Sequence, residues 1–185
     1  MFRYSPWTAE IRPTDLGHCA MNDKRIAAVR KAALLRFPLP SKGIHGIQHW
    51  ERVHANAVFL AKHSGADLTV VRLFAYLHDC CRESDGSDFE HGLRAAHFAE
   101  TLRDTVLELD DRQFEKLAYA CEFHERGRVT DDPTVGTCWD ADRLDLGRVG
   151  IRPNPKLLST RRAKRSAVID WAWARSRGKK AHLKR

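Results

Sequence analysis

The sequence predicts an all-α protein, a single helical bundle of about six to eight helices. Apolar residues recur at the three- and four-residue spacing of amphipathic helices, and no segment alternates with the two-residue period of a half-buried strand. Prolines and glycines cluster between the helical patterns. The chain has 185 residues, 43% hydrophobic and 30% charged, which is typical of one globular domain with a sizeable core.

The pattern divides the chain into three parts. Residues 1–21 show no clear period, and we expect an irregular N-terminal arm there. Residues 22–158 contain the helical patterns that would form the bundle. Residues 159–185 are expected to form a basic C-terminal helix and tail, because alanines and tryptophans at helical spacing alternate with Lys and Arg.

The most apolar helical pattern covers residues 67–83, DLTVVRLFAYLHDCCRE. Asp67 is a typical N-cap, and the residues after it leave almost no polar face, so we expect a helix that is buried on most sides. Its last turn would carry His78 and Asp79 into the interior. An imidazole and a carboxylate are costly there without a partner, and a divalent cation pairs with both. Metal binding is therefore the first hypothesis.

Four more polar side chains lie on apolar stripes of other expected helices. His49 and His91 each begin a stripe, His124 ends one, and Asp142 lies in the middle of one. Buried polar groups need partners, so we expect these side chains to meet. The helices are expected at residues 22–36, 49–64, 67–83, 91–109, 112–125, 137–146 and 159–177.

The bulk properties indicate a cytoplasmic protein without a membrane partner. No apolar run approaches the length of a bilayer span, and the first residues lack the basic and apolar regions of a signal peptide. The five cysteines form no CxxC pair and lie mostly within apolar patterns, as reduced and buried cysteines do.

The net charge of +8 is concentrated at the end of the chain. Residues 161–185 contain ten Lys and Arg and a single acidic residue, Asp170. Nucleic acid is a candidate partner of this segment, through phosphate contacts and stacking on Trp171 and Trp173. A helix that packs its aromatic side chains on the core and leaves its bases in water is the more common arrangement.

The polar residues that lie on apolar stripes follow a fixed order along the chain: His, then His-Asp, then two further His, then Asp. The first member lies in an HxxRV motif (His49, Arg52, Val53), the second in LHD and the last in ADRLD. This pattern, over residues 45–146, resembles the HD-domain superfamily of metal-dependent phosphohydrolases. The resemblance implies an all-helical HD-type domain at residues 22–158, a divalent metal cofactor, and hydrolysis of a phosphate ester.

Carried onto this sequence, the resemblance implies that His49, His78, Asp79 and Asp142 hold one divalent ion. Nitrogen and oxygen donors of this kind suit Mn, Fe, Co, Ni or Mg. Asp142 is preferred as the last ligand because it matches the Asp of the family's ADxL unit. Asp140 stays open as the alternative.

His91 and His124 match the extra histidines of the two-metal branches of this superfamily, in which paired ions lie ~3.5–4 Å apart. The match is partial, because Arg94 stands where those branches have glycine and Phe123 replaces one of two adjacent histidines. Two arrangements stay open. Either the site binds two ions, or it binds one ion and these histidines contact the substrate phosphate or carry protons.

The resemblance also implies residues that act on the substrate. Arg52, Arg82 and Arg143 lie next to ligands in the sequence and are candidate phosphate-binding residues. His45 lies in the glycine-flanked loop before the first ligand and is a candidate substrate contact.

Two carboxylates are expected to take part in catalysis. The resemblance implies that Asp79 acts as a metal ligand. Many relatives place a further carboxylate a few residues after HD, where it orients water or protonates the leaving group. Glu83 is the nearest match in this sequence, and Asp85 is the substitute.

These observations predict a metal-dependent phosphohydrolase that cleaves a phosphate ester of a nucleotide or related small molecule with metal-activated water. The alternative is a non-catalytic HD-fold module that binds nucleotides or nucleic acid and uses the basic residues 161–185. The sequence does not specify the ester, the metal or the oligomeric state.

Overall fold

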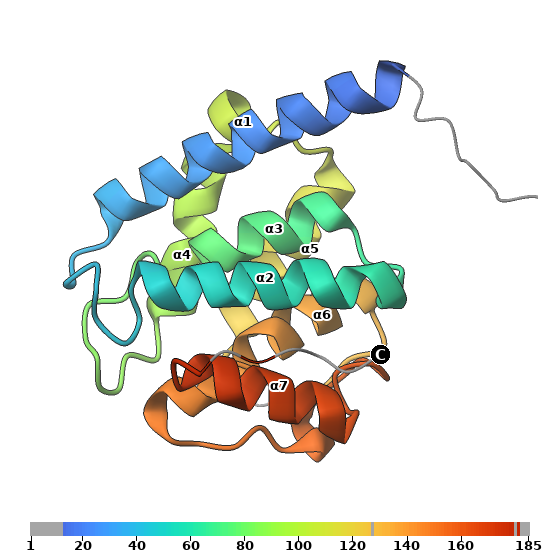
Figure 1. Cartoon of the computed structure of the whole chain (residues 1–185). Helices are drawn as coiled ribbons and strands as arrows, with labels where there is room; N and C mark the ends of the chain where they lie inside the picture. The colour runs from blue at the N-terminus through green and yellow to red at the C-terminus, as the bar shows by residue number, and fades with distance from the viewer. Residues whose placement is uncertain (1–12, 127, 180, 182–185) are drawn as a thin grey trace, which may run out of the picture.

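The computed structural model of the chain describes residues 13–126, 128–179 and 181, with residues 13–22 described by their backbone alone. These residues form seven α-helices and contain no β-strand, which confirms the all-α fold (Figure 1). The α-helices are α1 (Pro13–Arg36), α2 (Ile47–Ser64), α3 (Leu68–Leu77), α4 (His91–Thr101), α5 (Asp111–Phe123), α6 (Pro133–Arg143) and α7 (Ser166–Ser176). Three short segments accompany them: a π-helix η1 (Arg103–Leu107) and the 3-10 helices η2 (Leu146–Val149) and η3 (Pro155–Leu157).

Helix α3 lies at the centre and contacts α1, α2, α4, α5 and α6. Asp67 caps it, because one of its carboxylate oxygens accepts hydrogen bonds from the backbone N–H groups of Thr69 and Val70 at 2.9 and 3.1 Å. Seven of its ten residues are buried. Each large apolar side chain buried in this way contributes roughly 1.5–3 kcal/mol, so this helix anchors the core.

The other helices surround this centre. Figure 1 shows α2 beside α3, with α1 crossing one side of the bundle and α7 on the opposite side. Helix α1 is tied to α2 by a hydrogen bond of 2.8 Å from Arg30 to Glu51, whose carboxylate also accepts one of 3.0 Å from Tyr76 of α3. Helix α7 closes a second apolar cluster with Leu60 and Leu144.

Two helices begin at prolines, earlier than we expected. Helix α1 begins at Pro13 instead of residue 22, so the irregular arm expected over residues 1–21 is helical from Pro13 onward; residues 1–12 lie outside the described part. Helix α6 begins at Pro133, behind the N-cap Asp132, where we expected a loop up to residue 136. Proline suits the first helical position because its fixed φ is helical and its missing N–H has no partner there anyway.

The last helix begins later than expected, at Ser166 instead of residue 159. Asp140 of α6 accepts hydrogen bonds of 2.7 Å from the backbone N–H groups of Ser159 and Thr160. These contacts hold the chain in a turn where the sequence pattern predicted helix, since a buried carboxylate binds the local N–H groups.

The fourth helix is shorter than the apolar stripe predicted. It ends at Thr101, and the π-helical η1 follows where we expected helix up to residue 109. The chain leaves η1 through Glu108, whose φ of 45° is left-handed. The extra residue of a π-helical turn shifts the register of the stripe, and sequence periodicity does not show such a shift.

Gly92 brings the start of α4 against the end of α5. A Cβ atom at this position would lie 2.5 Å from the carbonyl oxygen of Cys121 and 2.8 Å from that of Glu122. Only glycine permits this approach of one backbone to the other. The approach places His91, the first residue of α4, beside His124, which follows α5.

The four cysteines with described side chains (Cys80, Cys81, Cys121 and Cys138) are buried and free, and Cys19 lies outside those residues. In the described part of the chain, no helix combines the length and the apolar character needed to cross a membrane.

Candidate metal centre

Five elements bring the six predicted ligands to one place. His49 comes from the first turn of α2, and His78 and Asp79 follow α3 directly. The remaining three are His91 at the start of α4, His124 just after α5, and Asp142 in the last turn of α6. The side chain of Asp142 is 14% exposed, and the other five are buried. The cluster therefore forms the buried floor of a site that opens at Asp142.

The first pair of histidines turns its Nε2 atoms toward each other. Nδ1 of His78 is 3.2 Å from the carbonyl oxygen of Phe74, which can only accept, so Nδ1 donates. Nδ1 of His49 lies 2.7 Å from the carboxylate of Asp145 and also donates. In these neutral tautomers both Nε2 atoms carry lone pairs, and they lie only 3.1 Å apart.

The second pair repeats this arrangement. Nδ1 of His91 donates to the carbonyl oxygen of Asp88 at 2.5 Å, and Nδ1 of His124 donates to that of Cys121 at 2.7 Å. Their Nε2 atoms lie 3.0 Å apart. Backbone carbonyls thus orient three of the four imidazoles, and a carboxylate orients the fourth, as is usual for histidines that bind metals.

Asp79 lies between the two pairs, and each of its oxygens faces one of them. Oδ2 is 3.5 Å from Nε2 of His49 and 3.6 Å from that of His78. Oδ1 is 3.1 Å from Nε2 of His91 and 3.5 Å from that of His124.

Asp142 approaches the first pair, and its ligand atom also lies within 4.8 Å of those of His78 and His124. Its Oδ1 is 3.4 Å from Nε2 of His49 and 3.8 Å from Nε2 of His78. Asp140 points elsewhere, toward Ser159 and Thr160. Of the two aspartates left open by the sequence, Asp142 is therefore the one that faces the cluster.

The protonation states of Asp79, Asp142 and His78 suit a cation. Burial opposes the ionisation of Asp79, but the surrounding histidines outweigh it and hold the pKa of Asp79 well below its ordinary value. Burial also opposes ionisation of Asp142, yet His78, His49 and Arg148 lower its pKa to about 2. Burial lowers the pKa of His78 to about 3, so its imidazole is neutral. Ionised carboxylates and neutral imidazoles are the forms that bind metals. Burial opposes protonation of His124, but the carboxylate of Asp79 outweighs it and raises the pKa of His124, so this ring would release a proton on binding a metal.

The donor set as a whole fits a divalent ion. Ligand atoms of His49, His78 and Asp79 lie within 4.8 Å of one another, as do those of Asp79, His91 and His124. Facing lone pairs in a buried site repel unless a proton or a cation lies between them. Imidazole nitrogen and carboxylate oxygen are donors for divalent ions such as Mn, Fe, Co or Ni, so a metal can take the place of protons between the facing atoms.

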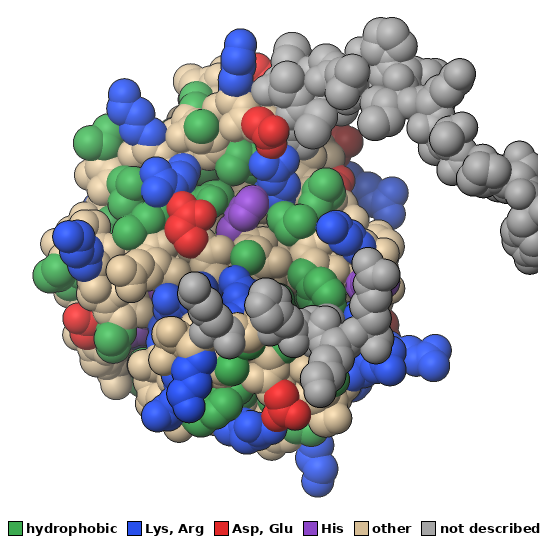
Figure 2. Space-filling model, viewed as in Figure 1, with side chains coloured by type: hydrophobic (Ala, Val, Ile, Leu, Met, Phe, Trp, Pro, Cys, Tyr) green, Lys and Arg blue, Asp and Glu red, His purple; other side chains and the backbone are tan. Residues whose placement is uncertain are grey.

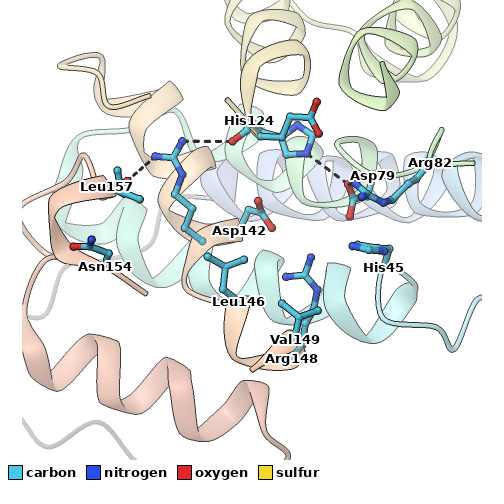
Figure 3. Close-up of a pocket in the computed structure, with 12 residues that line it drawn as sticks. His45, Asp79, Arg82, His124, Asp142, Leu146, Arg148, Val149, Asn154 and Leu157 are labelled. Atoms are coloured by element: carbon cyan, nitrogen blue, oxygen red, sulfur yellow. Dashed lines mark hydrogen bonds and ion pairs between the residues drawn. The ribbon is translucent and has the colours of Figure 1, made fainter. Parts of the chain in front are cut away.

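A cavity of about 350 Å³ opens above this floor (Figure 3). Asp79, His124 and Asp142 lie at its base. The walls combine charged and apolar side chains, namely His45, Arg82, Glu125, Arg143, Leu146, Arg148, Val149, Asn154 and Leu157. Its volume lies at the small end of the range for small-molecule sites.

The predicted substrate-binding residues have different surroundings. His45 and Arg82 line the cavity, and Nδ1 of His45 is 3.0 Å from the carboxylate of Asp85. Arg143 also lines it, but its guanidinium donates to the carbonyl oxygens of Arg128 at 2.6 Å and Leu157 at 2.7 Å, which ties the loops together.

Arg52 and Glu83 lie away from the residues that line the cavity. Arg52 donates two hydrogen bonds to Asp145, of 2.6 and 3.0 Å, and so supports the carboxylate that orients His49. The side chain of Glu83 is 62% exposed and lies 3.7 Å from Arg94.

Three residues of the site were missed by our sequence reasoning. Asp145 orients His49, Arg148 lines the cavity near Asp142, and Glu125 lies 3.3 Å from His91. Asp145 follows Asp142 by three residues, within the ADRLD motif, and this spacing places both on one face of a helical turn. No comparable signal marks Arg148.

Comparison with solved structures finds the same fold in a protein described as a predicted HD superfamily hydrolase from an uncultured Thermotogales bacterium. The two chains are 23% identical, the match covers 84% of this chain and 87% of that chain, and the TM-score is 0.61. This chain therefore has the HD-domain fold. No protein-family model and no curated protein matches it.

Proposed function

We propose that this HD-fold chain is a metal-dependent phosphohydrolase that cleaves a phosphate ester of a nucleotide or a related small molecule. The observation that carries the proposal is the cluster itself: imidazole nitrogens and carboxylates converge at the base of a cavity that also presents arginines. His49, His78, Asp79 and Asp142 would hold the ion. The ion could be Mn, Fe, Co, Ni or Mg.

The chemistry follows from these residues. When bound, a divalent ion supplies Lewis acidity and ionises a water for attack on phosphorus. Arg148 and Arg82, on the cavity walls, would neutralise charge on the equatorial oxygens of the phosphate. Leu146, Val149 and Leu157 offer an apolar wall for the rest of the substrate.

A small substrate is favoured by the size of the cavity. About 350 Å³ is close to the lower limit for sites that enclose a drug-sized molecule, so a phosphate with one modest organic group suits it better than a polymer.

Several residues are candidates for the group that donates a proton to the leaving group. The resemblance implies Glu83 as one candidate proton donor. Its side chain is 62% exposed, which argues against a catalytic position shielded from water. Glu125 and His45 have the advantage of a place at the cavity wall, and Nδ1 of His45 lies 3.0 Å from the carboxylate of Asp85.

A hydrolysis screen tests the proposed function. Mono-, di-, tri- and cyclic phosphates are supplied with Mn, Co, Ni, Fe and Mg in turn. We expect at least one ester to be cleaved by the wild-type chain and not by the double variant His78→Ala with Asp79→Ala. A folded double variant that cleaves the best substrate at the wild-type rate would show that the cluster does not catalyse the reaction.

The alternative, nucleic-acid binding through residues 161–185, has less support. Arg175 stacks over Trp171 at 4.4 Å and Arg177 over Trp173 at 5.1 Å, so both tryptophans already have partners within the chain. On the face in Figure 2, Lys and Arg are scattered among acidic and apolar side chains. Salt-sensitive RNA or DNA binding that is lost on removal of residues 161–185 would favour this alternative.

A further inference from the structure

The metal cluster has two halves that share Asp79. The first half consists of His49, His78 and Asp142 with Oδ2 of Asp79, and the second half consists of His91 and His124 with Oδ1 of Asp79. If ligand atoms alone decided the metal count, each half would take one ion.

We propose that the guanidinium of Arg82 supplies the positive charge of the second half, so that the centre binds a single divalent ion, in the first half. This inference rests on the proposed function, because it concerns the same metal centre.

The contacts of Arg82 carry the inference. Its Nη1 atom lies 3.1 Å from Nε2 of His91 and 3.2 Å from Nδ1 of the same ring. The same atom lies 3.8 Å from Oδ1 of Asp79. Arg82 thus contacts two of the three residues whose atoms a second ion would need.

The guanidinium is fixed in this position. Nε donates to the carbonyl oxygen of Ser84 and Nη2 to that of Gly86, both at 2.9 Å. The side chain is only 12% exposed. A swing of Arg82 away from the cluster would break both hydrogen bonds at once, so its charge stays beside His91.

The balance of charge also favours a single ion. Asp142 faces both histidines of the first half, at 3.4 and 3.8 Å from their Nε2 atoms. In the second half its ligand atom lies within 4.8 Å of that of His124, and Asp79 is the carboxylate that faces both histidines. The next carboxylate, Glu125, approaches His91 from the opposite ring nitrogen, at 3.3 Å from Nδ1. A second dication would have to share one carboxylate with the first ion and lie next to a guanidinium, where like charges repel strongly because the site is buried.

The test counts Mn²⁺ ions on the full chain. Mn²⁺ alone is titrated into chelator-treated protein, free ion is followed by its paramagnetic resonance signal, and the bound spectrum distinguishes an isolated ion from a coupled pair. We expect about one ion per chain for the wild type, as an uncoupled signal. Arg82→Gln removes the charge and is expected to take up a second ion, with a coupled spectrum.

Two further variants serve as controls. Arg148→Gln removes another arginine of the same cavity, whose guanidinium donates to the carbonyl oxygen of Ile44 instead, and is expected to keep a single ion. His124→Ala in the Arg82→Gln background is expected to lose the second ion and keep the first. Circular dichroism and thermal unfolding establish that each variant is folded.

The outcomes separate this inference from the proposed function. Two coupled ions on the wild-type chain would contradict the role of Arg82 but would not contradict the proposed function. This outcome is observed on the wild-type chain alone, without any substitution. A folded Arg82→Gln variant that still binds one ion would contradict the role of Arg82 equally. A wild-type chain that binds no Mn²⁺ would overturn the proposed metal centre itself.

Discussion

Asp145 accepts a hydrogen bond from Nδ1 of His49 at 2.7 Å, although the two residues are 96 positions apart in the chain. Asp145 is buried and also receives two hydrogen bonds from Arg52. Arg52 fixes the position of this carboxylate, and the carboxylate accepts the proton on Nδ1 of His49, so that Nε2 faces the cluster. The pair therefore connects the start of α2 to the chain after α6 through the metal centre.

Asp145→Asn should weaken metal binding. An amide holds the ring of His49 less firmly and no longer raises its basicity, and changes of this kind next to a metal ligand typically reduce affinity by about 10–100-fold. The measurement is the dissociation constant for Mn²⁺ in a calorimetric titration. Asp170→Asn is the matched control, because Asp170 forms an exposed ion pair with Arg152. An unchanged dissociation constant for Asp145→Asn would contradict this role.

Asp142 and Asp140 should respond in opposite ways to the same substitution. Asp142→Asn removes a proposed ligand of the first half and should abolish tight Mn²⁺ binding. Asp140→Asn should retain metal binding but lower the free energy of unfolding by about 1–3 kcal/mol, since the turn at Ser159 and Thr160 loses a buried acceptor. Titration and urea unfolding measure the two quantities. Loss of metal binding in Asp140→Asn alone would reverse the assignment of the ligand.

The cap of α6 should make stability depend on pH in the acid range. Asp132 accepts hydrogen bonds of 2.9 Å from the backbone N–H groups of Thr134 and Val135, and its carboxylate lies 2.6 Å from Lys116. Burial opposes ionisation, but Lys116 and the N–H groups outweigh it, so the pKa of Asp132 lies below its ordinary value of 3.8.

The lowered pKa of Asp132 determines how stability changes with pH. A carboxyl group with a lowered pKa in the folded state stabilises the fold above the unfolded-state pKa, and this contribution is lost as pH falls through the folded-state value. Asp132→Asn keeps the cap but not the charge. We expect it to be less stable than the wild type at pH 7, with a difference that shrinks as the pH falls below about 4. Urea unfolding of metal-free protein from pH 7 to below pH 4 measures this difference, and a difference that grows toward low pH would contradict the expectation.

Local patterns in the sequence predicted the helices, although not all of their ends, and marked the histidines and aspartates that lie together in the cluster. Asp67 and the apolar run after it predicted α3, because capping and burial act within one helix. The histidines and aspartates of the cluster could be predicted to meet because each lies on an apolar stripe and needs a buried partner.

The sequence did not predict contacts between distant segments. Arg52 lies next to a ligand in the chain, as a phosphate-binding residue would, yet it pairs with Asp145, 93 residues away. Arg143 binds backbone carbonyls of two loops for the same reason: its partners are fixed by tertiary structure alone. The helix starts at Pro13 and Pro133 were missed: residues 1–21 show no clear apolar period, and residues 126–136 were expected to form a loop. Proline nevertheless suits the first helical position.

Anomalous diffraction from crystals of the Mn²⁺-loaded chain tests the central claim most directly. The account predicts a single strong peak within coordination distance of Nε2 of His49, Nε2 of His78, and the carboxylates of Asp79 and Asp142. Fully loaded crystals with no anomalous peak among these four residues, or with the peak elsewhere in the chain, would contradict it.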